Sequence, residues 1–212
     1  MKKNFFIAFE GIDGSGKSTQ VKLLTEKLEE AGLKVYTTFE PTDSPMGKII
    51  RDVFNHRMEA DERTVAALFV ADRLDHLLNK TNGILKKLEE GFTVITDRYY
   101  LSSFAYQSQY VDLKWIMQAN SLSVNLRKPD LNIYIDILPG LSIERLNKGR
   151  NSMELYETLE NLQNVRNRYF EVIELLKDEE QVFITDGNRN SKVIAHEIWN
   201  KIRHEFVETP AL

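Results

Sequence analysis

Residues 11–18 read Gly11-Ile12-Asp13-Gly14-Ser15-Gly16-Lys17-Ser18 and are the most informative stretch of this 212-residue chain. They follow the apolar run Phe5-Phe6-Ile7-Ala8-Phe9 and open a helical pattern over residues 17–30. A strand, a glycine-rich loop and a helix in this order are the setting that a phosphate-binding loop requires. Glycines let the backbone approach an anion closely, and the loop N–H groups and the helix dipole attract that anion. We therefore expect this loop to bind a nucleoside triphosphate.

The side chains of the loop have distinct expected roles. Lys17 places an ammonium near the β- and γ-phosphates, and Ser18 offers a hydroxyl to the Mg²⁺ that accompanies the nucleotide. A surface turn is the alternative for a bare match, but the flanking strand and helix favour the nucleotide site. The residues expected to contact ATP are Gly11, Ile12, Asp13, Gly14, Ser15, Gly16, Lys17, Ser18 and Thr19.

Bulk properties exclude several classes of protein. The net charge of −4 indicates no nucleic-acid-binding surface. Apolar runs are far shorter than the ~18 residues that span a bilayer, so we expect no membrane partner. The chain has no cysteine, which excludes disulfides, thiol catalysis and cysteine-based zinc sites. Glu10 interrupts the first apolar run, so no signal peptide with an apolar segment of ~7–15 residues is expected. Together these features predict a cytoplasmic protein.

Short apolar runs alternate with helical patterns along the chain. Several runs are apolar on consecutive residues, which is typical of strands covered on both faces. Such alternation predicts a parallel sheet with right-handed crossovers. The expected fold is α/β, a single domain over residues 1–212 with a five-stranded parallel sheet flanked by helices in three layers. We expect strands at 5–9, 34–38, 92–96, 131–136 and 181–185, and helices at 17–30, 61–78, 113–126, 153–176 and 192–206, with a further helix that carries Arg51.

Ligands of such sheets bind beyond the carboxyl ends of the strands. Asp97 and Arg98 follow the third run, where the carboxylate could orient the Mg²⁺ shell and the guanidinium could fork onto phosphoryl oxygens. The alternative is a surface Asp–Arg pair, which the upstream phosphate loop makes less favoured. Glu40-Pro41 follows the second run, and Arg51 on the next helix either reaches an acceptor phosphate or is simply solvated.

Two further groups suit a nucleobase. Phe69 and Arg73 are four residues apart on one helix face, which places an aromatic plane beside a guanidinium. Taken alone, this spacing favours a core phenylalanine and an arginine paired with Asp72 or Asp75. Gln107 could pair with both a donor and an acceptor on a base edge, or it could be an exposed glutamine.

These residues, taken together, resemble the thymidylate kinases of the P-loop nucleoside monophosphate kinase group. The resemblance runs nearly end to end and implies a P-loop kinase fold, ATP and dTMP as substrates, Mg²⁺, and a homodimer. The matching segments are Phe9-Glu10-Gly11-Ile12-Asp13-Gly14-Ser15-Gly16-Lys17-Ser18-Thr19, Glu40-Pro41, Ser44-Pro45-Met46-Gly47 with Arg51, Leu68-Phe69 with Asp72-Arg73, Asp97-Arg98-Tyr99, Ser102-Ser103 with Ala105-Tyr106-Gln107, and Lys128-Pro129-Asp130-Leu131.

The resemblance also implies a role for each residue of the acceptor site. Phe69 would stack on thymine, Arg73 would donate to a pyrimidine carbonyl, and Gln107 with Ser103 would read the base edge. Tyr106 would crowd the 2′ position and favour deoxyribose. Asp13 would hydrogen-bond the 3′-hydroxyl, and Arg51 and Arg98 would hold the 5′-phosphate. Glu40 would help to order the loop that follows it.

A mobile lid over ATP is expected at about residues 141–157. The usual lid ending Asp-Arg-x-Glu reads Glu154-Leu155-Tyr156-Glu157 here, so the family arginine is missing. Three cations remain, Arg145, Lys148 and Arg150. We expect Arg150 to close on the phosphates, because it follows Gly149 and an arginine can fork onto γ-phosphoryl oxygens. Arg145 lies at helical spacing from Leu141 and is expected to be fixed on that helix.

The expected reaction is transfer of the ATP γ-phosphoryl group to dTMP, with Lys17, Arg98 and Arg150 as catalytic cations and Ser18 and Asp97 at the metal. A deoxynucleoside kinase is the first alternative, since Glu40 could serve as the base that a hydroxyl acceptor needs. A non-catalytic nucleotide switch is the second. It would keep the phosphate loop but would not need Phe69, Arg73 and Gln107 together.

Overall fold

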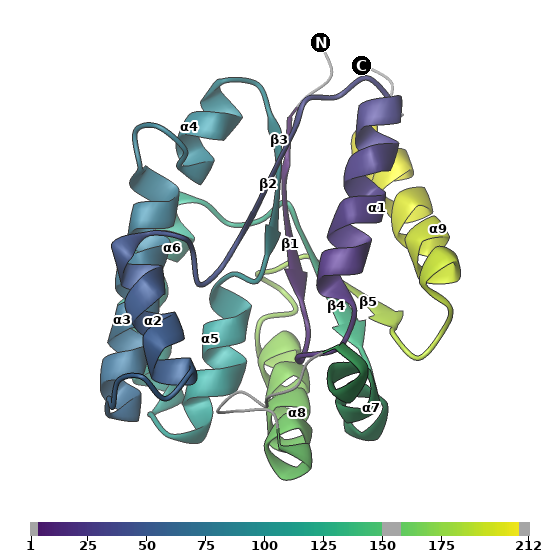
Figure 1. The fold of residues 1–212 in the computed structure, drawn as a ribbon. Coiled ribbons are helices and arrows are strands. Elements are labelled where there is room, and N and C mark those ends of the chain that lie inside the picture. The colour runs from purple at the N-terminus through teal and green to yellow at the C-terminus, as the bar shows by residue number, and fades with distance from the viewer. Residues whose placement is uncertain (1–3, 150–157, 208–212) are drawn as a thin grey trace.

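A five-stranded parallel sheet with helices on both faces forms the centre of the molecule (Figure 1). The computed structural model describes residues 4–149 and 158–207. The strand order is β2-β3-β1-β4-β5, and every neighbouring pair is parallel. This confirms the predicted three-layer α/β fold. The strands are β1 (Phe6–Glu10), β2 (Val35–Phe39), β3 (Thr93–Asp97), β4 (Leu131–Asp136) and β5 (Val182–Asp186).

The two faces of the sheet bury two separate cores. Ile7 and Phe9 of β1 pack against α1 (Lys17–Glu30) and α9 (Ser191–Ile202), whereas Phe6 and Ala8 point to the opposite core. Figure 1 shows α1 and α9 together on one side of the sheet. All five side chains of β1 are buried, which explains its continuous apolar run. The opposite core includes side chains of α3 (Glu62–Leu78), α4 (Ile84–Glu89), α5 (Tyr100–Tyr106), α6 (Leu113–Leu126) and α8 (Leu159–Leu175).

Side-chain caps fix where the helices begin. Ser44 precedes α2 (Pro45–Phe54), and its Oγ accepts from the Gly47 N–H at 3.1 Å, while Pro45 occupies the first turn. Thr158 has an extended backbone, and its Oγ1 accepts from Asn161 N–H at 3.2 Å. The predicted helix at 153–176 therefore begins later than expected, because Thr158 caps α8 instead of continuing a helix.

Other boundaries differ from the predicted ones. Four of the five strands begin and end one residue later than predicted, because the parallel ladder includes the residue that follows each apolar run. The last predicted helix ends at Ile202 and continues as a π-helical turn, Arg203–Val207. Short helix α4 was not predicted. Helix α7 (Pro139–Gly149) covers the first part of the predicted lid, and residues 150–157 lie outside the described part.

The strands end together at one edge of the sheet, as parallel pairing requires. Phe9 of β1 pairs with Asp97 of β3, and Glu10 pairs with Tyr134 of β4. This edge therefore receives the loops that follow β1, β2 and β3, and the predicted site residues lie in these loops and on the helices that come after them. Within residues 4–149 and 158–207, no helix is long and apolar enough to cross a membrane.

Candidate active site

The phosphate loop joins β1 to α1 at this edge and needs its glycines. Gly11 has a φ of +142° and a Cβ there would lie 2.7 Å from Ile135 O, so a side chain would collide with β4. Gly14 has a φ of +72°, and its Cβ would lie 2.8 Å from Ser142 O of α7. Ser142 Oγ also donates to the Asp13 carbonyl. The loop is thus packed between the sheet and α7.

Lys17 folds back onto its own loop. Its Nζ donates to Gly11 O and Ile12 O, both at 3.1 Å. Burial lowers the pKa of the Lys17 ammonium, and the charge of Arg98 lowers it further, against opposing effects of Asp97 and Asp13. A bound polyphosphate would supply the negative charge that this buried cation lacks.

Arg98 is the most connected cation of the site. It follows β3 with a φ of +77°, a strained left-handed conformation for a non-glycine residue. Its Nη2 donates to Asp13 Oδ1 and to Tyr106 OH, the latter at 3.1 Å. Burial by itself raises the pKa of the Asp13 carboxyl, but the charges of Arg98 and Lys17 outweigh burial and lower that pKa. The predicted alternative, a surface pair of Asp97 with Arg98, is wrong, because Arg98 pairs with Asp13.

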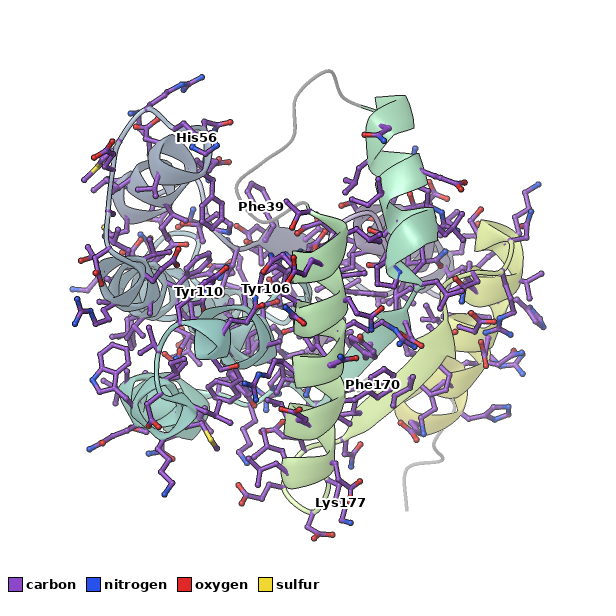
Figure 2. The ribbon with its side chains drawn as sticks, turned by 90° about the horizontal axis from the view of Figure 1, so that it is seen from below. Phe39, His56, Tyr106, Tyr110, Phe170 and Lys177 are labelled. Carbon is purple, nitrogen blue, oxygen red and sulfur yellow. The ribbon has the colours of Figure 1, made fainter. Side chains whose placement is uncertain are left out.

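A partly open cavity of about 260 Å³ lies beside Arg98. Each of the nine residues predicted to contact dTMP lines this cavity. They are Asp13, Glu40, Arg51, Phe69, Arg73, Arg98, Ser103, Tyr106 and Gln107. Figure 2 looks onto this edge of the sheet and shows Phe39 and Tyr106, two lining residues, between His56, which follows α2, and Phe170 of α8 in this view.

A second, more open cavity of about 690 Å³ lies over the phosphate loop. Six of the residues predicted to contact ATP line it, namely Asp13, Gly14, Gly16, Lys17, Ser18 and Thr19. Gly11, Ile12 and Ser15 of the loop are buried and are not among its lining residues. The two cavities share Asp13, Phe39, Glu40 and Arg98. These four residues therefore mark the boundary between the donor and acceptor sides.

A buried ion pair connects β2 to α3. Arg73 donates to Glu40 Oε2 from Nε at 2.9 Å and from Nη2 at 2.7 Å. The other oxygen, Oε1, lies 3.0 Å from His76 Nδ1, and the side chain of Glu40 is only 1% exposed. The predicted pairing of Arg73 with Asp72 or Asp75 is wrong. Asp72 instead accepts from Thr42 and Ser44, which ties the loop after β2 to α3.

Phe69 belongs to the core and to the cavity wall at once. It packs with Ile50 and Val53 of α2 and its ring centroid lies 5.9 Å from that of Phe54. Ser103 Oγ and Gln107 Oε1 are buried in the same wall, and neither has a hydrogen-bond partner in the part of the chain that the structure describes. Buried polar atoms without partners are costly, and a ligand with complementary groups would satisfy them. The predicted alternative of an exposed Gln107 is wrong.

Arg51 lines the cavity from α2 and is not simply solvated. Its Nη1 donates to Pro41 O at 2.9 Å and to Thr42 O, and its Nη2 lies 3.3 Å from Asp43 Oδ1. Both carbonyls belong to the loop after Glu40, whose peptide bond to Pro41 is cis. The guanidinium therefore holds this loop over the cavity.

Ser18 and Asp97, the two residues predicted to lie at the metal, are in direct contact. Ser18 Oγ donates to Asp97 Oδ2 at 2.7 Å across 79 residues of sequence. No group of three or more His, Asp or Glu side chains suited to a metal occurs among the described residues. Mg²⁺ commonly binds through one or two protein groups together with substrate phosphates, so this pair fits a nucleotide-borne Mg²⁺.

Comparisons with known proteins agree with this geometry. A family model described as thymidylate kinase matches residues 9–198. A probable thymidylate kinase of Pyrococcus abyssi is 36% identical and covers 97% of this chain and 98% of that protein. A thymidylate kinase of Leptospira interrogans is 39% identical over 92% of each chain.

The chain belongs to the thymidylate kinase family. Family membership confirms the predicted resemblance and the expectation of an enzyme of the P-loop kinase class. The chain also matches a probable thymidylate kinase of Methanocaldococcus jannaschii at 36% identity over 95% of each protein. The matched region contains every predicted site residue, including those of both cavities.

The donor side of this thymidylate kinase family member includes an arginine of α7. Arg145 lines the open cavity, and its Nη2 donates to Gly187 O at 3.0 Å while its Nη1 reaches Ser15 O at 3.4 Å. Arg145 lies on helix α7, as predicted, and these contacts hold its guanidinium in place. Arg150 lies outside the described residues, so its role stays a prediction.

Sequence reasoning assigned no role to Phe39, Ser102 and Tyr169, which contribute to the site. Phe39 lines both cavities although its side chain carries no group that suggests chemistry. Ser102 and Tyr169 hold Arg98 from α5 and α8, at 3.2 and 3.4 Å from Nη1. The position of Ser102 four residues after Arg98 was a usable signal, whereas Tyr169 had none, because it lies 71 residues from Arg98.

Proposed function

We propose that this chain transfers the γ-phosphoryl group of ATP to dTMP and yields dTDP. Membership of the thymidylate kinase family supports phosphotransfer to dTMP. The observation that carries the proposal is that one cavity is lined by all nine predicted dTMP residues and meets the phosphate-loop cavity at Arg98 and Asp13. An acceptor there would face the end of the ATP phosphate chain.

In this proposal dTMP enters with its base against Phe69. Ser103 Oγ and Gln107 Oε1 then find partners on the base edge, and Arg73 donates to a pyrimidine carbonyl. Tyr106 donates to Asp13 Oδ2 at 2.8 Å, and this pair would lie beside the deoxyribose. A 2′-hydroxyl would crowd the Tyr106 side, whereas Asp13 would accept from the 3′-hydroxyl. Arg51 and Arg98 would hold the 5′-phosphate.

The acceptor needs no general base. The second pKa of a phosphate monoester is about 6, so a reactive dianion is already present at neutral pH. Glu40 is unsuited to the alternative role of base for a nucleoside hydroxyl, because both of its carboxylate oxygens are engaged by Arg73 and His76. Catalysis then consists of positioning and of neutralising charge on the transferred group, by Lys17, Arg98 and a lid cation. Ser18 and Asp97 would hold Mg²⁺, which would supply positive charge to the phosphates of ATP.

Three further parts of the proposal concern assembly, location and the lid. A homodimer is supported by the exposed Trp115 and Leu122 on α6, which leave apolar surface uncovered. A cytoplasmic location is supported by the absence of cysteine. A mobile lid over residues 141–157, within one domain, is proposed on the same ground.

A coupled assay of ADP release tests the reaction. We would supply ATP and Mg²⁺ with each nucleoside monophosphate in turn, and with thymidine. The proposal expects the highest kcat/KM with dTMP. Robust turnover of thymidine with none of dTMP would identify a deoxynucleoside kinase, and nucleotide binding without turnover of any acceptor would identify a switch.

The Phe69→Ala variant should raise the KM for dTMP by about tenfold, because base–aromatic stacking is typically worth ~1–3 kcal/mol. Phe69→Leu is the matched variant. It keeps apolar volume against Ile50 and Val53 but removes the ring face. We expect a raised KM in both variants and a lowered melting temperature mainly in the alanine variant. A normal KM in Phe69→Leu would mean that Phe69 serves only the core.

The lid cation is tested by steady-state kinetics of Arg150→Ala and Arg145→Ala. We expect Arg150→Ala to lower kcat much more than it changes the KM for dTMP, as for a contact made mainly in the transition state. Arg145→Ala should mainly raise the KM for ATP, since Arg145 bridges Ser15 and Gly187 beside the open cavity. A silent Arg150→Ala with a crippled kcat in Arg145→Ala would assign the closing charge to α7.

A further inference from the structure

Glu10 is a buried carboxylate for which the proposed mechanism has no task. It ends β1 directly before the phosphate loop, and it is 0% exposed. Burial raises the pKa of Glu10 to about 7, and contacts with Ser102, Arg98, Tyr169 and Tyr99 oppose that rise. A buried acid is costly to ionise, and perturbed acids of this kind cluster at functional sites.

Three donors from two other elements converge on this carboxylate. Tyr99 N–H donates to Oε1 at 2.9 Å. Ser102 Oγ donates to Oε2 at 2.5 Å, and Tyr169 OH donates to the same oxygen at 2.9 Å. Glu10 thereby joins the end of β1 to the start of α5 and to the middle of α8.

The same two hydroxyls face Arg98 on their other side. Arg98 Nη1 donates to Ser102 Oγ at 3.2 Å, to Tyr169 OH at 3.4 Å and to Gly11 O at 3.0 Å. The hydroxyl oxygens lie 2.8 Å from each other, so the four side chains form one cluster. A hydroxyl has one proton and two lone pairs. When its proton is directed to Glu10, its lone pairs remain available to accept from Arg98.

We propose that Glu10 is a positioning residue for Arg98. By accepting from Ser102 and Tyr169, it turns their lone pairs toward the guanidinium and holds Nη1 at the boundary of the two cavities. It also holds the Tyr99 amide, directly after the strained backbone of Arg98. The inference rests on the proposed function, in which Arg98 contacts the phosphoryl group in transfer.

The Glu10→Gln variant removes the charge and keeps the shape. An amide can donate through its NH₂ group to one hydroxyl, which occupies a lone pair of that hydroxyl and releases its proton from Glu10, so fewer lone pairs are directed at Arg98. We expect kcat/KM for dTMP to fall about 10- to 100-fold, in line with the loss of hydrogen bonds to a charged group. Tyr169→Phe keeps the ring, removes one of the two relay hydroxyls, and should cause a smaller loss in the same direction.

A double-mutant cycle separates positioning from a general structural role. Glu10→Gln is measured in the wild-type chain and in the Arg98→Lys background, in which the forked contacts are already lost. If Glu10 acts through Arg98, its substitution should change kcat/KM less than about threefold in that background. Wild-type turnover of dTMP is the reference. If the wild-type chain does not turn over dTMP, the proposed function fails. If it does, the double-mutant cycle tests the role of Glu10 alone.

Glu180→Gln is the matched control. Glu180 is also a buried carboxylate, accepting from Tyr100 OH at 2.6 Å and from Asn132 Nδ2 at 3.2 Å, but it precedes β5 at the opposite edge of the sheet. Its substitution should leave kcat/KM for dTMP within about twofold. An unchanged kcat/KM in a folded Glu10→Gln variant would overturn the inference. So would a loss of kcat/KM from Glu10→Gln that is as large in the Arg98→Lys background as in the wild-type chain.

Discussion

The Lys17→Ala variant should lose nearly all turnover, with kcat lower by on the order of 10³-fold or more. In the proposed mechanism the ammonium leaves Gly11 O and Ile12 O for the β- and γ-phosphates and neutralises charge that develops during transfer. Electrostatic groups of this kind act in a water-poor site, where their effect is far larger than at a surface. Steady-state measurement of kcat with saturating ATP and dTMP gives the result.

The fold should survive this substitution, because Lys17 contributes a buried cation and no apolar packing. Burial lowers its pKa, so the fold gains little by keeping the charge there. Lys22→Ala is the matched control, since Lys22 lies on the same helix α1 and is exposed. We expect near-native melting temperatures for both variants and normal kcat only for Lys22→Ala. A Lys17→Ala variant with near-native kcat would remove the phosphate loop from the mechanism.

Arg98→Ala is the second variant with a very large expected effect. Arg98 lines both cavities, so its guanidinium can contact the acceptor phosphate and the transferred group at once. The loss of a catalytic arginine in phosphoryl transfer costs about 10³-fold or more in kcat. Arg98→Lys keeps the charge but cannot donate to Asp13 and to the hydroxyl pair simultaneously. Its kcat should therefore lie between that of Arg98→Ala and that of the wild type.

Arg168→Ala controls for loss of an arginine elsewhere, because Arg168 is exposed on α8 and pairs with Glu171. Its kcat should match that of the wild type. If Arg98→Ala raised only the KM for dTMP and left kcat intact, Arg98 would bind the acceptor without a part in transfer. Equal activity of Arg98→Lys and the wild type would show that the forked geometry is not needed.

Much of the donor site could be predicted from the sequence because its residues are contiguous. The residues of the phosphate loop lie within one local turn, and Gly11 and Gly14 have the positive φ angles that only such a turn requires. Strand and helix types also followed from local patterns, since continuous burial and helical periodicity are properties of neighbouring residues. The roles of the acceptor residues came from the family resemblance. Spacing alone favoured a core role for Phe69 and a pairing of Arg73 with a neighbouring aspartate.

The sequence did not predict which residues form ion pairs when the partners are far apart in the chain. Arg73 was expected to pair with a neighbour on its own helix, and it pairs with Glu40, 33 residues away. Local charge proximity cannot compete with a buried carboxylate that has no water to solvate it. The strand ends were misjudged for a related reason. Polar residues such as Asp97 remain in the ladder because backbone pairing continues past the apolar run, as in the pair of Asp97 with Phe9, while the side chain accepts from Ser18.

The sequence by itself determined a phosphate loop, a parallel α/β sheet and the edge at which the site lies, because these depend on local backbone preference and on burial periodicity. The tertiary structure alone decided that nine residues from five segments line one cavity, that Asp13 is the partner of Arg98, and that Glu10 meets Tyr169 across 159 residues. Contacts between residues so far apart in the sequence depend on strand order and register, which bring α5 and α8 over the end of β1. A local sequence pattern contains no information about that arrangement.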